Sequence, residues 1–223
     1  MVSPRTHAGP APAAVGYNLA AIALALALGG LGVAHVINAA RQAAALPAAA
    51  ATSDPALTRS IGGRDLEIPV TWFRYGEQPE AGFVSQVELQ LHLPLGVDGA
   101  LLPVDVTLLP PSRVRPSARL LDGVYLHRFG TDEAEGPPGL VGKPLRGNEG
   151  FAGETVWYDP LTADPFVAKC SEPVAPGAAA RCLRAVTLGP GLAALYAFDA
   201  EVLVNWKRFD AEIRQRLEAI GAY

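Results

Sequence analysis

A long uncharged apolar segment near the N-terminus constrains this sequence most strongly. From Leu19 to Val36 the chain reads LAAIALALALGGLGVAHV, and no acidic, lysine or arginine side chain occurs between Arg5 and Arg41. A helix needs about 20 apolar residues to cross a bilayer, because the hydrocarbon core is about 30 Å thick. Residues 17–40 are therefore predicted to form one transmembrane helix, with the lipid bilayer as its partner.

A cleaved secretory signal peptide is the alternative interpretation of this segment. Arg5 would supply its positive charge, and small residues near Ala34 or Ala39 would supply a cleavage site. The apolar run is longer than the about 7–15 residues typical of a signal peptide, so the sequence favours a retained signal anchor. Both interpretations export the remainder of the chain.

Small residues recur every four positions along the same segment, at Ala21, Ala25 and Gly29. In lipid, small residues let two helices approach closely, since packing rather than the hydrophobic effect drives their association. An alanine-rich segment also produces such rows by chance. The row is compatible with a membrane-protein partner or a homo-oligomer formed through this helix.

The chain has only two cysteines, and they stand at the two ends of one Pro/Ala/Gly loop, CSEPVAPGAAARC. Strand-like runs flank this loop at Pro165–Cys170 and Cys182–Leu188. If these runs pair as a hairpin, the two sulfurs face each other within disulfide range. Two unrelated thiols are the alternative, whereas a redox pair would need C-x-x-C spacing and a metal site would need more ligands. The sequence therefore predicts a Cys170–Cys182 disulfide, which requires an oxidising compartment.

Together these features predict a single-pass protein of the bacterial inner membrane with its C-terminal domain in the periplasm. The charges that flank the span are too balanced to orient it, so the orientation depends on the disulfide. The linker is expected because its alanine-rich sequence is interrupted by prolines and has no sustained apolar face. The resulting division is a cytoplasmic tail (1–16), a signal anchor (17–40), an Ala/Pro linker (41–60) and a periplasmic domain (61–223).

Alternation of apolar and polar residues indicates strands in the exported part. The clearest case is Phe83–Leu95, FVSQVELQLHLPL, where every second residue from Val87 onward is apolar. Period two is typical of a strand with one buried and one solvent-exposed face. Further strands are expected at 66–72, 104–109, 123–129, 155–158, 165–170, 182–188 and 192–198. Successive strands with short turns favour an antiparallel sheet or sandwich.

A helix is expected to close the fold over about residues 199–220, with Asp199 as its N-cap. Its apolar residues recur at spacings of three and four, which is the pattern of an amphipathic helix: Val202, Trp206, Phe209, Ile213, Leu217 and Ile220. Such a helix would cover one face of the sheet. The predicted fold class is therefore α+β, with a transmembrane helix followed by a mainly antiparallel β domain and a C-terminal amphipathic helix.

Composition and motifs exclude several classes of function. The net charge of −4 and the pI near 5.6 provide no basic footprint for nucleic acid. Neither a G-x-S-x-G elbow nor a P-loop or dinucleotide-binding motif occurs, so no catalytic residue or cofactor is indicated. The glycine-rich segment 139–154 is expected to be a surface loop, whose Lys143, Arg146 and Glu149 could contact a partner.

Two histidines lie outside the N-terminal tail and the membrane edge. His92 shares the polar side of its expected strand with Glu88, and His127 lies in the expected strand 123–129. If those strands were neighbours, His92, His127 and Glu88 would form a metal site suited to assisted hydrolysis. Single surface histidines are the simpler interpretation, because no paired motif links the two.

Three segments carry a resemblance: IPVTWFRYGEQPEAG (Ile68–Gly82), the run from YDP to PFVAKC (Tyr158–Cys170) and AEVLVNWKRFDAEIRQRL (Ala200–Leu217). In these, the chain from Ile61 onward resembles uncharacterised proteobacterial proteins that have one N-terminal apolar segment and an envelope domain. The resemblance implies a bacterial periplasmic location and no particular activity.

The leading functional hypothesis is a non-catalytic accessory or interaction subunit of an envelope complex. The predicted membrane anchor and the predicted disulfide-bonded domain occur without a recognisable set of catalytic residues. An envelope metal-assisted hydrolase is the first alternative, so the sequence does not decide whether the protein is an enzyme. The second alternative is a periplasmic ligand-binding module with its pocket between sheet and helix.

Overall fold

The computed structural model describes residues 55–74, 81–173, 175 and 177–223. The predicted tail, signal anchor, small-residue row (Ala21, Ala25 and Gly29) and most of the linker lie outside these residues. Within the described part, no helix is both long and apolar enough to cross a membrane.

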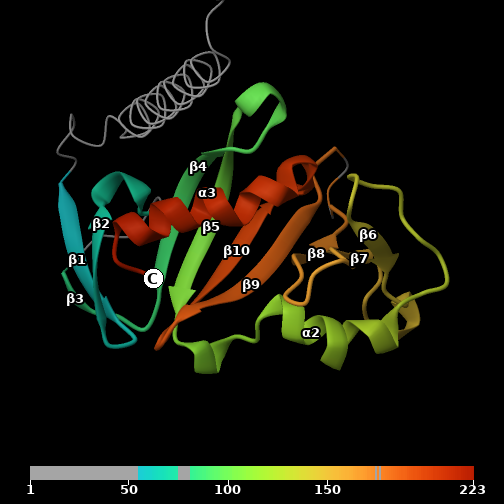
Figure 1. Cartoon of the computed structure of the whole chain (residues 1–223), viewed down its shortest axis with the longest axis horizontal. Coiled ribbons are helices and arrows are strands. Elements are labelled where there is room, and N and C mark those ends of the chain that lie inside the picture. The colour runs from blue at the N-terminus through green and yellow to red at the C-terminus, as the bar shows by residue number, and fades with distance from the viewer. Residues whose placement is uncertain (1–54, 75–80, 174, 176) are drawn as a thin grey trace, which may run out of the picture. The chain divides into compact units, whose positions relative to one another are not determined.

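A seven-stranded sheet forms the body of the domain (Figure 1). Its order is β4-β5-β10-β9-β8-β7-β6, and each neighbouring pair is antiparallel. The strands are β4 (Val87–Pro94), β5 (Leu101–Leu109), β6 (Val141–Pro144), β7 (Glu154–Tyr158), β8 (Val167–Ser171), β9 (Arg181–Gly189) and β10 (Leu192–Asp199). The prediction of a mainly antiparallel β domain is confirmed, as one large sheet with a helix on it.

A second, three-stranded sheet has the order β2-β1-β3. It consists of β1 (Ala56–Ile61), β2 (Arg64–Pro69) and β3 (Gly82–Phe83). Because β1 begins at Ala56, the predicted boundary between linker and domain at residue 60 was wrong. Residues 56–60, which form the end of the expected linker, all pair with β2 as part of β1. The alanine-rich sequence before them resembles a linker, so the short strand was not recognised.

The turn between β1 and β2 lies against the turn between β9 and β10. Gly62 and Gly191 both have positive φ angles, 60° and 82°. A Cβ atom built on either glycine would collide with the backbone carbonyl of the other. Glycine is therefore required at both positions, by conformation and by space.

The C-terminal segment begins as a 3-10 helix, η6 (Ala200–Asn205), and continues as α3 (Trp206–Ala219). The prediction of one helix from 199 was wrong at its start, because the Asp199 side chain does not cap it. The Asp199 carboxylate instead accepts a hydrogen bond from Arg181, with an N···O distance of 2.9 Å. The amphipathic stripe is confirmed in α3, whose buried residues are Phe209, Ile213 and Leu217.

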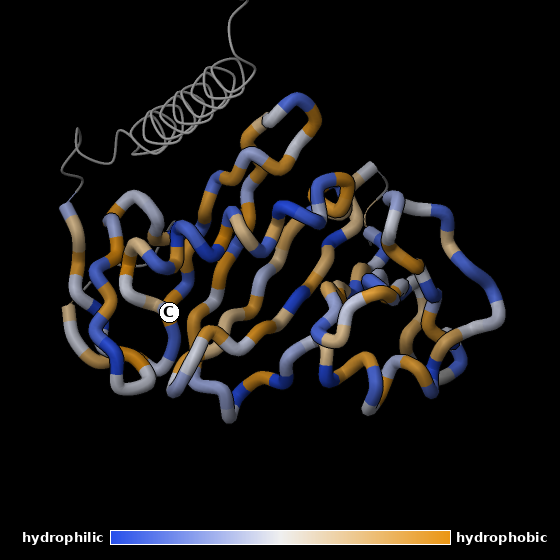
Figure 2. Tube along the Cα trace, in the orientation of Figure 1, coloured by the Kyte–Doolittle hydropathy of each residue, from blue (hydrophilic) through white to orange (hydrophobic). Residues whose placement is uncertain are grey.

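The main core fills the space between α3 and the large sheet. Hydrophobic and hydrophilic residues alternate along the long strands (Figure 2), so each strand buries one side toward the helix. Phe209 is fully buried, with its ring centroid 4.7 Å from that of Phe198 and 5.7 Å from that of Tyr196. The centre of the space between sheet and helix, where a ligand pocket was predicted, is filled by packed aromatic side chains, and a cavity of about 130 Å³ lined by Arg184, Tyr196 and Asp210 lies beside them.

A smaller core lies on the opposite side of the sheet, over strands β6 to β8. It is covered by α2 (Ser117–Gly123) and the 3-10 helix η4 (Tyr125–Arg128). The predicted strand 123–129 was wrong, because this segment ends α2 and forms η4, which places Leu121 and Tyr125 in one buried cluster with Val156 and Val167. Segment 139–154 is likewise no continuous surface loop, since it contains β6 and the start of β7.

The predicted disulfide is present. Cys170 of β8 lies directly opposite Cys182 of β9, with a Cα–Cα distance of 3.9 Å. Both residues are buried and belong to the main core. The bridge therefore fixes the register of the β8–β9 hairpin from inside the fold.

The C-terminal residue Tyr223 is hydrogen-bonded to the buried Tyr196. Burial is the largest cause that raises the pKa of Tyr196, and burial also raises that of Tyr223. Both tyrosines therefore keep their protons in the folded chain at a pH where the unfolded chain loses them, above about pH 10. The unfolded state then binds fewer protons, so stability is retained below this pH and falls above it.

We expect Tyr196→Phe to reduce the fall of the free energy of unfolding at alkaline pH, because phenylalanine does not titrate. The variant should lose about 1 kcal/mol near neutral pH, since the hydrogen bond to Tyr223 is removed. Urea unfolding of both proteins at pH values from 8 to about 11.5 gives the two slopes, and comparison with wild type cancels the contribution of other groups. Equal slopes would contradict the assignment.

Candidate interaction face

Within the part of the chain that the structure describes, α3 covers one side of the large sheet, and other elements cover the second side only in part. On the second side, α2 and η4 lie over strands β7 and β8, and α2 also contacts β9, where the Ala185 N–H donates to the Ser117 hydroxyl. We call the rest of that side, formed by β4, β5, β10 and β9, the open face. Its half-buried or exposed side chains alternate with core residues along each strand: Glu88, Gln90, Asp105, Thr107, Arg181, Leu183, Leu195 and Ala197.

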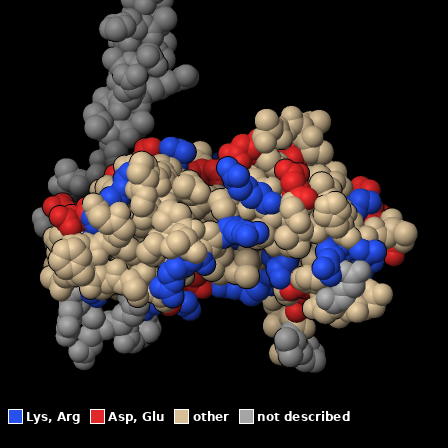
Figure 3. Space-filling model, turned by 90° about the horizontal axis from the view of Figure 1, so that it is seen from below, with Lys and Arg blue, Asp and Glu red and all other residues tan. Residues whose placement is uncertain are grey.

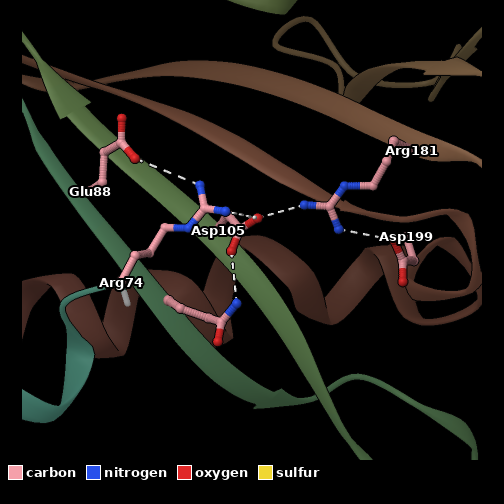
Figure 4. A network of polar contacts seen from close by, with 6 residues as sticks. Arg74, Glu88, Asp105, Arg181 and Asp199 are labelled. Atoms are coloured by element: carbon pink, nitrogen blue, oxygen red, sulfur yellow. Dashed lines mark hydrogen bonds and ion pairs between the residues drawn. The ribbon is translucent and has the colours of Figure 1, made fainter. Parts of the chain in front are cut away.

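A network of ion pairs crosses the open face, with Asp105 at its centre (Figure 4). Oδ2 of Asp105 lies 2.6 Å from Nη2 of Arg181 and 3.7 Å from Nη2 of Arg74. Oδ1 accepts a hydrogen bond of 3.0 Å from the Gln90 amide. The Asp105 side chain is only 13% exposed, so these partners replace the water that its charge would otherwise bind.

Each arginine of the network also holds a second carboxylate. Arg181 lies 2.9 Å from Asp199, and Arg74 lies 3.6 Å from Glu88. Partial burial lowers the pKa of Arg181, but the hydrogen bonds and charges of Asp199 and Asp105 outweigh burial and raise it above the usual value. The network thus fixes charges in place on the open face, an arrangement suited to recognising a complementary polar surface.

A cavity of about 280 Å³ opens beside this network, between the sheet and the segment that leads into α2. Leu183, Ala185 and Leu195 form the apolar floor that the sheet contributes to its lining, and the charged residues of the lining are Arg113, Arg115 and Lys169. Tyr125 also lines it; burial, and then the charge of Glu154, raises the pKa of this tyrosine, so it remains a neutral hydroxyl. We call this the open-face cavity.

The structure does not bring the predicted metal ligands together. His92 and Glu88 lie on β4, whereas His127 lies in η4, next to the Phe129–Leu145 bridge beside β6. Strands β4 and β6 are the two opposite edges of the sheet. Among the residues that the structure describes, no group of three His, Cys, Asp or Glu side chains is placed to hold a metal ion. The predicted site was therefore wrong.

Sequence reasoning missed the network residues Arg74, Asp105, Arg181 and Asp199. A signal was present at Asp105, a charge between two apolar residues on a strand, which therefore points to the side opposite the core. The partner could not be identified, because Arg181 is 76 positions away and the pairing requires β5 to neighbour β10.

Comparisons with known proteins give one indication of the fold. No protein-family model and no curated protein matches the sequence. Among solved structures, the chain is similar to Smlt3025, an immunity protein of the Stenotrophomonas maltophilia type IV secretion system. The two share 13% sequence identity with a TM-score of 0.52, over 75% of this chain and 93% of that one. At this identity the similarity shows a shared fold, a mainly antiparallel sheet with a C-terminal helix.

Proposed function

We propose that this protein is a non-catalytic interaction subunit of the bacterial envelope. Residues 17–40 would anchor it in the inner membrane, and its periplasmic domain would bind another protein through the open face. The observation that supports binding is the open face itself, where a fixed charge network borders an apolar cavity. Specific protein interfaces combine these features, an apolar anchor site with a polar surround.

Two independent features support the placement in the envelope. The uncharged run from Leu19 to Val36 has the length of a membrane span. The disulfide of Cys170 and Cys182 involves every cysteine of the chain, and such bonds persist in oxidising compartments. Carbonate extraction of native membranes and alkylation of thiols before lysis test the placement. We expect protein in the membrane pellet with both cysteines protected; soluble protein or labelled thiols would refute it.

We expect Arg181→Ala to weaken capture of the partner by about tenfold, because it removes the cation that joins Asp105 to Asp199 on the open face. The measurement is recovery of cross-linked complexes from native membranes solubilised in mild detergent. The matched control is Arg208→Ala on α3, which removes an arginine of similar exposure that is paired with Glu212. Equal recovery with both variants and wild type would argue against the open face, and recovery of a lone monomer in all cases would argue against the function.

A second candidate function is protection against a toxin that acts in the envelope. The observation that favours it is the fold shared with a secretion-system immunity protein, which extends over 93% of that chain. Each gene adjacent to the one for this chain can be expressed with a periplasmic signal, with and without this protein. Growth arrest that this protein relieves would support an immunity role. If no product of an adjacent gene is toxic, the immunity role is wrong and the accessory role is retained.

A further inference from the structure

The open-face cavity presents apolar surface in the middle of a polar face. Leu183 is 41% exposed although it lies on an interior strand, and Leu195 and Ala185 lie beside it in the cavity floor. The cavity is concave, and its volume of about 280 Å³ lies at the lower limit of the about 300–1,000 Å³ typical of small-molecule sites. An apolar side chain from another protein would fill this apolar lining while the rest of that protein contacts the polar face around it.

The lining of this cavity carries positive charge that no carboxylate among the described residues pairs with. Arg115 makes no ion pair or hydrogen bond with any residue that the structure describes, and Arg113 donates only to the backbone carbonyl of Ser85, at 3.3 Å. Three carboxylates of the open face and its surroundings already have cationic partners. Arg181 holds Asp105 and Asp199, and Lys169 lies 2.5 Å from Glu154. Two arginines therefore remain available to an incoming group.

This positive charge is a local feature of an acidic chain. The net charge is −4, yet residues 106–121 contain three arginines and no acidic residue. Figure 3, seen from the side on which α2 lies, shows lysine and arginine side chains gathered across the middle of the molecule. Long-range attraction at this face therefore favours a negatively charged surface.

We propose that the partner inserts an apolar side chain of an acidic segment into the open-face cavity, with carboxylates of that segment paired to Arg113 and Arg115. This inference rests on the proposed function and specifies the chemistry of the partner. The apolar floor favours a protein segment over an inorganic anion, because an anion gains nothing from contact with the apolar side chain of Leu183. Because the apolar residues form a hollow and do not protrude, a protein segment also fits better than a lipid surface.

The experiment places a photo-cross-linking phenylalanine derivative at Leu183 of the full chain in its native cells. The matched control carries the same group at Val204, which is 59% exposed on η6. Mass spectrometry identifies the peptide that is cross-linked at Leu183, and that peptide is then synthesised and titrated against the detergent-solubilised full chain. We expect a peptide with an apolar residue flanked by Asp or Glu.

The charge-reversed double variant, Arg113→Glu with Arg115→Glu, should bind this peptide at least about tenfold more weakly, and wild-type affinity should fall with salt. Arg113→Lys with Arg115→Lys keeps the charge and should retain most of the affinity. Lys207→Glu with Arg208→Glu on α3 makes the same change in net charge and should have little effect. Thermal unfolding of each variant confirms that it is folded.

Two outcomes separate this inference from the proposed function. If the peptide cross-linked at Leu183 is basic or neutral, or if its affinity is unchanged by the charge-reversed double variant, the proposal of an acidic partner segment is wrong. The proposed interaction function would still hold. No cross-link at Leu183, together with no effect of Arg181→Ala, overturns both. If the cross-linked peptide comes from a second copy of this chain, the proposal that the partner is a different protein is wrong, and the open face mediates self-association.

Discussion

Replacing Phe209 by alanine is expected to lower the free energy of unfolding by about 4 kcal/mol, the largest effect of any substitution considered. The ring is fully buried at the centre of the contact between α3 and the sheet. Its centroid lies 4.7 Å from Phe198, 5.7 Å from Tyr196 and 5.8 Å from Phe166. Truncation removes these contacts and leaves a cavity that the sheet cannot collapse to fill, because each neighbour is held by its own strand or by other aromatic contacts.

Phe83 provides the matched control for this substitution, since the same change is made at a ring that is 92% exposed. Phe83→Ala should change stability by less than about 0.5 kcal/mol. Urea unfolding followed by far-UV circular dichroism measures both variants against the wild type. Similar losses at the two positions would mean that the helix–sheet contact contributes less than its burial indicates.

Removal of the disulfide is expected to lower the free energy of unfolding by about 3 kcal/mol, because the bridge closes a short loop in the unfolded chain. The two cysteines are separated by 12 positions and lie opposite each other in the β8–β9 ladder. The double variant Cys170→Ala, Cys182→Ala removes the bond without leaving a free thiol. Both side chains are buried, so the loss also includes a small packing contribution.

Reduction of the wild-type protein is the control for the double variant. Unfolding in urea with and without dithiothreitol gives the contribution of the bond in an unaltered sequence. We expect reduced wild type and the double variant to unfold at similar urea concentrations, both well below oxidised wild type. A difference under about 1 kcal/mol between oxidised and reduced protein would show that the strands hold this loop without the bridge.

The elements that the sequence predicted are those whose local pattern allowed a single interpretation. Strict alternation from Val87 to Leu95 fits a strand and no helix, and β4 is found there. Two cysteines at the ends of one loop permit one intramolecular pairing. The apolar stripe containing Phe209 and Ile213 places α3 on the sheet whatever the order of the strands.

The errors arose where a local pattern fits two structures or where distant segments meet. VYLHRF alternates like a strand, but Tyr125 also lies four residues after Leu121, and contacts with β7 and β8 favour the helical arrangement. The metal-site prediction depended on strand order, which local sequence does not specify. For the same reason the charge network could not be predicted, since it joins β4, β5, β9 and β10 across more than 70 positions.

The interlocked turns at Gly62 and Gly191 have an evolutionary consequence. Neither position tolerates a side chain while the other turn stays in place, so mutation at one site cannot be rescued by a change at the other. Descendants that preserve this contact must inherit both glycines together. Gly62 lies in the β1–β2 turn, and Gly191 follows Pro190 in the β9–β10 turn. This pair of glycines would identify distant relatives whose overall sequence identity is low.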